Sequence, residues 1–341
     1  MSDPDQSSTD TNNENESALT QRVLCMEDYR ALANAVQTLE DPSLAARLAN
    51  LVGLPIESIL KSLPKAASDT IGKASEIALR KTLDVALLTM RKGQRPASRG
   101  MHKLAATASG AVGGATGFAG LAIELPITTG IIFRSIADLA RAEGEDLTDP
   151  RALIACMEVF ALGGPRKSDD AGESGYFTSR VALAKAVQEA TKCLAKSAAS
   201  AEAPLLVRFI TKLASRFGVV VSYKTAAQFA PIVGALGGAT INILFVDHYQ
   251  DMAQGHFTVR RLERAYGKDF VKGAYLSILN NQEDPRYLPV DDPRFEVIPV
   301  RVSKRDPEEP QAAETDPQAA EETIKRLSEL SPDTGAVQDS E

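Results

Sequence analysis

Two long stretches without a charged residue limit the folds that are open to this chain. They cover residues 104–123 and 225–246, and both are rich in Gly and Ala. Each contains nearly the same seven residues, GAVGGAT and GALGGAT, although no longer repeat joins them. On a helix, small residues four positions apart share one face and let two backbones approach closely. We expect the two stretches to cross in the centre of the domain through these packing residues: Gly110, Gly113, Gly114, Gly117, Gly234, Gly237, Gly238 and Asn242.

The length of these stretches would suit helices that span a bilayer, which need about 20 apolar residues. Their composition does not, because Ala, Gly, Thr and Ser take the place of the Leu, Ile and Phe of such helices. The chain also has no Trp to anchor a helix at the membrane interface. A buried hairpin in a soluble domain is therefore favoured. Dipping onto a membrane and two true spans are the alternatives that these residues leave open.

The rest of the chain reads as helical. Apolar residues recur at helical spacing, and the alternation of helix and strand that marks a doubly wound fold is absent. Pro126 suits the first turn of a helix that Gly144 would end, and Asp149 with Pro150 suits the start of the next one. Only residues 295–302 look like a strand. The helices are expected at 19–39, 43–63 (two short ones broken near Gly53 and Pro55), 65–91, 126–143, 150–162, 176–199, 204–217, 222–246 and 256–281.

Charge divides the chain into three parts. The formal net charge is −7, but residues 1–17 carry −5, residues 303–341 carry −7, and residues 18–302 carry +5. The two ends are polar and acidic and cannot bury enough apolar surface to fold. The sequence therefore predicts an all-α, single compact multi-helix domain at 18–302, with disordered acidic tails at 1–17 and 303–341. The acidic start excludes a secretory signal peptide, and three Cys without a CxxC pair suit a reducing cytosol.

A basic segment precedes the first uncharged stretch. Residues 91–103 hold five bases and no acid, and their Gly and Pro predict a loop. Basic residues beside an apolar segment are typical of proteins that bind anionic lipid. A solvated loop, or one that pairs with the acidic tails, explains the pattern equally well. The candidate residues for binding anionic lipid are Arg91, Lys92, Arg95, Arg99 and Lys103.

The sequence resembles the EcsC family in three separated blocks. These are GAVGGATGFAGLAIELPITTGIIFRSIADLARAEGEDL at 110–147, RALIACMEVFALGG at 151–164 and PIVGALGGATINILFVDHYQDMAQGHFTVRRLE at 231–263. The likeness extends over about residues 20–282 and leaves out both tails. It implies a bacterial, mostly helical domain with membrane association, and it brings no catalytic residues to this chain. The family takes its name from a gene beside a bacterial ABC transporter.

No sequence motif for catalysis is present: the chain lacks GxSxG, HExxH and a Walker P-loop. Glu124 stands alone between uncharged residues, so it either caps a helix N-terminus, which is favoured, or lies buried in a pocket with Arg134 and Asp138. Asp247, His248 and Asp251 are better explained by a surface turn than by a metal site. Arg260, Arg261, Arg264 and Lys268 form a basic patch with too few aromatic residues to bind single-stranded nucleic acid.

These observations favour a non-enzymatic cytoplasmic protein that associates peripherally with the inner face of the membrane. Its expected partners are anionic membrane lipid and a membrane transport or secretion complex, with no nucleic acid and no cofactor. One alternative is a soluble hydrolase with a buried pocket around Glu124, Arg134 and Asp138. The other is a soluble adaptor that binds proteins through its tails.

Overall fold

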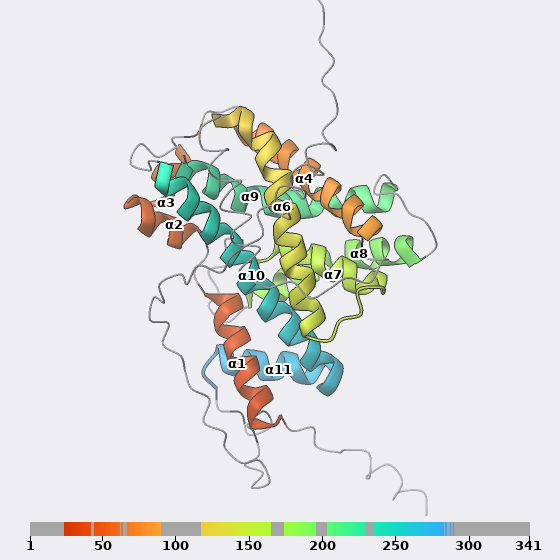
Figure 1. Ribbon diagram of the computed structural model, residues 1–341. Helices are drawn as coiled ribbons and strands as arrows, with labels where there is room; N and C mark the ends of the chain where they lie inside the picture. Colours follow the sequence, from red (N-terminus) through yellow and green to blue (C-terminus); the bar gives the residue numbers. More distant parts are fainter. Residues whose placement is uncertain are drawn as a thin grey trace, which may run out of the picture.

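The computed structural model describes residues 24–41, 44–61, 63, 67–89, 117–164, 174–195, 203–228, 235–282, 284, 287 and 289. These residues form helices without a strand, and the helices pack into one compact domain (Figure 1). The prediction of an all-α domain is confirmed. Both predicted tails, the basic segment 91–103 and the strand-like residues 295–302 lie outside the described residues.

The first four helices follow the sequence pattern closely. They are α1 (Met26–Glu40), α2 (Leu44–Val52), α3 (Ile56–Lys61) and α4 (Ala67–Thr89). The predicted break between α2 and α3 falls at Gly53, whose φ of +71° suits glycine better than any other residue. α4 buries the apolar stripe that includes Ile71, Leu79 and Leu83. Each of these helices is therefore defined by signals within its own residues.

α6 (Gly117–Ala142) differs from the prediction because Pro126 lies inside it rather than in its first turn. A proline in a helix interior removes one backbone hydrogen bond, so the sequence alone favours a helix that begins at Pro126. Leu121 and Leu125 are both buried, so packing holds the helix together on the N-terminal side of the proline. The other end agrees with the prediction. Gly144 has a φ of +79°, and its N–H donates to the carbonyl of Arg141.

α7 (Pro150–Glu158) begins as the sequence indicates. The side chain of Asp149 accepts a hydrogen bond from the backbone N–H of Arg151 at 2.8 Å, and Pro150 occupies the first turn. A short 3-10 turn, η2 (Val159–Ala161), follows. α8 (Gly175–Ala195) then begins one residue after Ser174, which binds the carboxylate of Glu40 at 2.5 Å.

The last three helices have other boundaries than the sequence predicts. They are α9 (Pro204–Gln228), α10 (Ala235–Tyr266) and α11 (Lys268–Leu279). The predicted break after residue 217 does not occur, because Gly218 is buried in a helix that continues past it. The predicted break between residues 246 and 256 does not occur either, because α10 is continuous to Tyr266. That helix ends before Gly267, whose φ is +90°. The second uncharged stretch is thus divided between the end of α9 and the start of α10.

α10 forms the axis of the domain and crosses its centre in Figure 1. Its 32 residues extend about 48 Å, and α1, α6, α9 and α11 pack along it. Its side chains supply two rings of a buried aromatic cluster, in which Tyr249 lies 5.3 Å from Phe160 and 5.2 Å from Phe245 between ring centres. α1 depends on the same axis, since it packs on α10 and α11. The Tyr275 hydroxyl donates to Glu40 at 2.9 Å across that contact.

Candidate functional site

Glu124 forms a buried ion pair with Lys224, which joins α6 to α9. The distance from Lys224 Nζ to Glu124 Oε1 is 2.5 Å, and the two side chains expose 0% and 5% of their surface. The ammonium also lies 4.9 Å from the centre of the Phe245 ring, a cation–π contact. Glu124 is the eighth residue of α6. The predicted capping role is therefore wrong, and the carboxylate is buried among helices, as the alternative held.

Arg134 and Asp138 do not join that buried pair. Arg134 is exposed, and it lies ten residues, or about 15 Å, further along the same helix. Asp138 forms an ion pair with Arg141 at 2.8 Å on the outer side of α6. The predicted pocket thus separates into one buried residue with its own partner and two residues elsewhere on the helix.

The predicted helix-packing residues are only partly within the described part of the chain. Gly117 begins α6, Gly237 lies in the first turn of α10, Gly238 is half-buried and Asn242 is fully buried. The crossing of the two uncharged stretches stays a prediction, because most of the first stretch lies outside the described residues. The same holds for these predicted positions: Gly110, Gly113, Gly114, Gly234, Arg91, Lys92, Arg95, Arg99 and Lys103.

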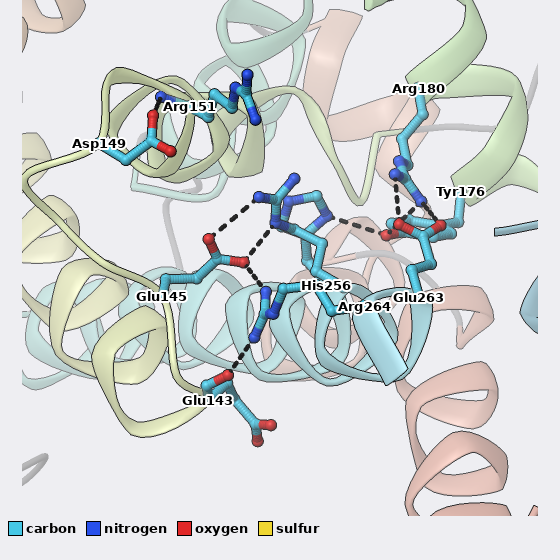
Figure 2. A network of polar contacts seen from close by, with 10 residues as sticks. Glu143, Glu145, Asp149, Arg151, Tyr176, Arg180, His256, Glu263 and Arg264 are labelled. Carbon is cyan, nitrogen blue, oxygen red and sulfur yellow. Dashed lines mark hydrogen bonds and ion pairs between the residues drawn. The ribbon is translucent and has the colours of Figure 1, made fainter. Parts of the chain in front are cut away.

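Ion pairs connect the C-terminal half of α10 to α8 and to the segment between α6 and α7 (Figure 2). Arg180 of α8 donates to both carboxylate oxygens of Glu263, at 2.7 and 3.0 Å. Arg260 binds Glu145, in the connection between α6 and α7, at 2.8 and 3.1 Å. Such two-bond pairs fix the orientation of both partners. Burial would raise the pKa of Glu145, but Arg260 together with a second arginine holds it below its ordinary value.

The predicted basic patch, formed by three arginines of α10 and by Lys268 of α11, is largely neutralised by these contacts. Arg261 binds Asp28 of α1 at 2.7 Å and Glu143 at 2.9 Å. Arg264 pairs with Glu145 and donates to the backbone carbonyl of Glu143 at 2.6 Å. The sequence could not show this, because every one of these acids is more than 100 residues away along the chain. The arginines hold helices together, and only Lys268 has no ion pair with a described residue.

Two unusual titratable groups lie inside this network. Glu158 at the end of α7 is buried, and burial raises its pKa although Arg180 and Arg260 act in the opposite direction. His256 of α10 is also buried, and its Nδ1 lies 3.0 Å from the Tyr176 hydroxyl. Burial, with smaller contributions from the same two arginines, holds the pKa of His256 well below its ordinary value. His256 is therefore neutral at physiological pH.

Glu158→Gln should make stability less dependent on pH. A carboxyl whose pKa is raised on folding binds its proton more tightly in the folded chain, so stability falls as pH rises from about 4.5 towards and through the raised value. The amide cannot ionise and removes that fall. We expect equal free energies of unfolding for both proteins near pH 4.5 and a more stable variant at pH 8, measured by urea unfolding. A constant difference across this range would contradict the assignment.

His248 lies inside α10 and not in the predicted surface turn. Its side chain is buried, and burial lowers its pKa to about 3, with a smaller contribution from Arg47. The ring packs against Gly163, which has a φ of +69°. Asp251 forms an ion pair with Arg47 at 3.3 Å. Among the described residues, no group of His, Cys, Asp and Glu side chains is arranged to hold a metal ion.

A basic surface lies on the outer sides of α8 and α9, which pack against each other. Arg216 of α9 donates to the Ser179 hydroxyl of α8 at 2.9 Å and ties the two helices together. Four further bases are exposed: Lys185 and Lys192 share one face of α8, and Arg208 and Lys212 share one face of α9. None of the four forms an ion pair with another described residue, in contrast to the arginines of α10.

Apolar side chains are exposed on the same two faces. Val181 of α8 leaves 71% of its surface in contact with solvent, and Leu205 and Val219 of α9 are also exposed. Val181 is four positions before Lys185, and Leu205 is seven before Lys212, so each shares its helix face with a base. Together these residues define the α8–α9 face: Val181, Lys185, Lys192, Leu205, Arg208, Lys212 and Val219. A surface that combines bases with exposed apolar groups suits an anionic interface.

This face was not predicted, although the sequence carries a signal for it. The two helices contain seven bases but only one acid, Glu189. The helical period of the apolar residues does not reveal this face, but the same period places Lys185 with Lys192 and Arg208 with Lys212. Two of the seven bases form ion pairs away from the surface, with Lys224 fully buried and Arg180 half-buried. Only the tertiary structure distinguishes these two from the exposed ones.

Comparisons with known proteins agree with the resemblance seen in the sequence. The model of the EcsC protein family matches residues 27–262, which is more than two thirds of the chain. No curated protein and no solved structure gives a match. Within the described part of the chain, no helix is both long enough and apolar enough to cross a bilayer.

Proposed function

This chain belongs to the EcsC protein family, and we propose that it is a non-enzymatic protein that binds the anionic inner face of the membrane peripherally. The observation that carries the proposal is the α8–α9 face, with four exposed bases and three exposed apolar side chains. Each base near an anionic membrane surface contributes about 1 kcal/mol. The apolar side chains add affinity by entering the headgroup region.

The basic segment 91–103 supplies a second attachment in this proposal. It joins α4 to the first uncharged stretch, and its five bases have no acid among them. The structure offers support on both sides of it. Leu88, just before the end of α4, and Ile123, in the first part of α6, are both largely exposed. Leu88 lies three residues before the basic segment, and Ile123 ends the uncharged stretch that follows it. Exposed apolar residues in the neighbourhood of a basic segment suit a protein that rests on a bilayer surface.

Co-sedimentation with vesicles tests the proposal. The full-length chain should bind vesicles of phosphatidylcholine mixed with phosphatidylglycerol, should not bind phosphatidylcholine alone, and should be released as salt rises. Replacing Lys185, Lys192, Arg208 and Lys212 together with Gln should weaken binding by about 100-fold or more at low ionic strength. A matched control removes four exposed bases of other helices: Arg30, Lys61, Arg151 and Lys268. This control should bind almost as tightly as the unchanged chain.

Other results would contradict the proposal. An equal loss of vesicle affinity in both four-base variants would mean that binding depends only on the net charge of the protein and not on the α8–α9 face. Binding to neutral vesicles that does not respond to salt would favour insertion of residues 104–123 or 225–246. Absence of binding to every vesicle would overturn the membrane function itself. A fourth protein, with all five bases of 91–103 changed to Gln, measures how much that segment contributes to binding.

A further inference from the structure

The α8–α9 face lacks a partner of opposite charge within the described part of the chain. Elsewhere in the domain, the exposed and half-buried arginines of α10 each have a carboxylate within 3 Å. On the α8–α9 face, Lys185, Lys192, Arg208 and Lys212 have none, and the one acid of the two helices, Glu189, is half-buried on α8. An uncompensated basic surface next to apolar side chains is suited to bind an acidic segment.

The chain contains such a segment outside the described residues. Residues 306–322 hold seven acids and no base, more like charges in succession than any other part of the sequence. Residues 1–17 are also acidic, but with five acids over the same length of 17 residues. The seven carboxylates exceed the four bases of the α8–α9 face, so they can neutralise it fully. Charge complementarity therefore favours residues 306–322 as the occupant of this face.

The described part of the chain ends within reach of this face. The ring of Tyr287 packs on Phe270 of α11 at 5.4 Å, and Tyr275 of α11 packs on Phe177, in the first turn of α8, at 5.0 Å. The described chain therefore ends beside α11, which contacts the start of α8. Lys192 lies about 22 Å further along α8. The 17 residues from Pro289 to residue 306 reach about 20–25 Å as a flexible chain and more when extended.

We propose that residues 306–322 bind the α8–α9 face of the same chain and that an anionic bilayer must displace them. The carboxylates pair with the exposed lysines and with Arg208, and the apolar side chains of the face are shielded until a membrane replaces the segment. The inference uses the face of the proposed function but goes beyond it, because the intramolecular contact exists without a membrane. In the free protein the segment covers the α8–α9 face, and in the membrane-bound protein the bilayer takes its place.

Cross-linking with a water-soluble carbodiimide tests the contact, because this reagent joins a carboxylate and a lysine amine that already touch. The full-length chain, without lipid, should give links from residues 306–322 to Lys185, Lys192 or Lys212, identified by mass spectrometry. These links should decrease at high salt, since exposed ion pairs are screened. Preferential links from residues 1–17, or links to the exposed Lys61 and Lys268 in equal yield, would overturn the assignment.

An equal mixture of isotope-labelled and unlabelled protein identifies which chain supplies the segment. Links within one chain carry a single isotope, and links between two chains carry both. Only single-isotope links agree with the proposal. Mixed links would assign the face to a second copy and overturn it.

Vesicle binding then tests the displacement. In the full-length chain, Glu308, Glu309 and Glu314 are changed to Gln and Asp316 to Asn. The matched control neutralises four acids of the other end, Asp3, Asp5, Asp10 and Glu14. If the segment covers the face nine-tenths of the time, the first variant should bind anionic vesicles about tenfold more tightly than the control. Equal affinity of the two variants, with the cross-links present, would refute the displacement. Cross-links in a chain that binds no vesicle would refute the proposed function but keep the contact.

Discussion

Lys224→Met is expected to lower the free energy of unfolding by about 3–5 kcal/mol. The substitution leaves the Glu124 carboxylate buried without the ammonium that lies 2.5 Å away in the unchanged chain. A buried charge without a partner loses its hydration and gains nothing in exchange. The cost is therefore much larger than that of an exposed ion pair, which contributes about 1 kcal/mol or less.

Urea unfolding of the full-length protein measures this loss, with Lys212→Met as the control. Lys212 lies on the same helix but is exposed, so its replacement should change stability by no more than about 0.5 kcal/mol. In the double variant Glu124→Leu/Lys224→Met both charges are gone, and most of the stability should return. Equal effects of the two lysine substitutions would contradict a buried ion pair between α6 and α9.

Gly163→Ala should destabilise the domain by about 2–4 kcal/mol. Two costs add at this position. The φ of +69° is unfavourable for any residue with a Cβ, and the added methyl group would lie 2.5 Å from Nε2 of the buried His248. The imidazole has little freedom to move away, because it also packs against Tyr249 at 5.1 Å between ring centres.

The neighbouring glycine provides the control. Gly164 has no positive φ, and a Cβ there would meet nothing within 4 Å, so Gly164→Ala should be neutral or slightly stabilising. Thermal unfolding of the two single variants compares the sites directly. A cycle with His248→Ala separates the contributions, since the steric part should vanish without the imidazole while the backbone part persists. Similar melting temperatures for Gly163→Ala and Gly164→Ala would contradict the close packing at His248.

Local signals predicted much of the fold. The break at Gly53, the cap formed by Asp149 and the glycine after α6 each depend on residues that are neighbours in the chain. These features need no tertiary contact, and the structure confirms them. The end of α9 was misplaced because a glycine such as Gly218 favours a helix end in isolation, whereas packing against other helices keeps the helix continuous there. The predicted gap at 247–255 was also wrong, because buried residues such as Tyr249 and Ala253 keep α10 continuous across it.

The candidate sites were harder to predict because their residues meet only in three dimensions. Glu124 and Lys224 are 100 residues apart, and the uncharged residues on both sides of Glu124 could not reveal its partner. The arginines of α10 looked like a free basic patch for the same reason, since Glu145 lies 115 residues before Arg260. The α8–α9 face was accessible to reasoning from the sequence, but only by following the bases along each helix.

The position of α1 has a consequence for synthesis on the ribosome. α1 packs on α10 and α11, and Glu40 meets Tyr275 only after another 235 residues have been added. At 5–20 residues per second, this delay is roughly 10 to 50 s. During that time the apolar stripe of α1, which includes Leu32, Val36 and Leu39, lacks the complete surface of α10 and α11 on which it packs in the folded domain. The nascent chain therefore exposes a helix-length binding site for chaperones at its beginning until its last helices emerge.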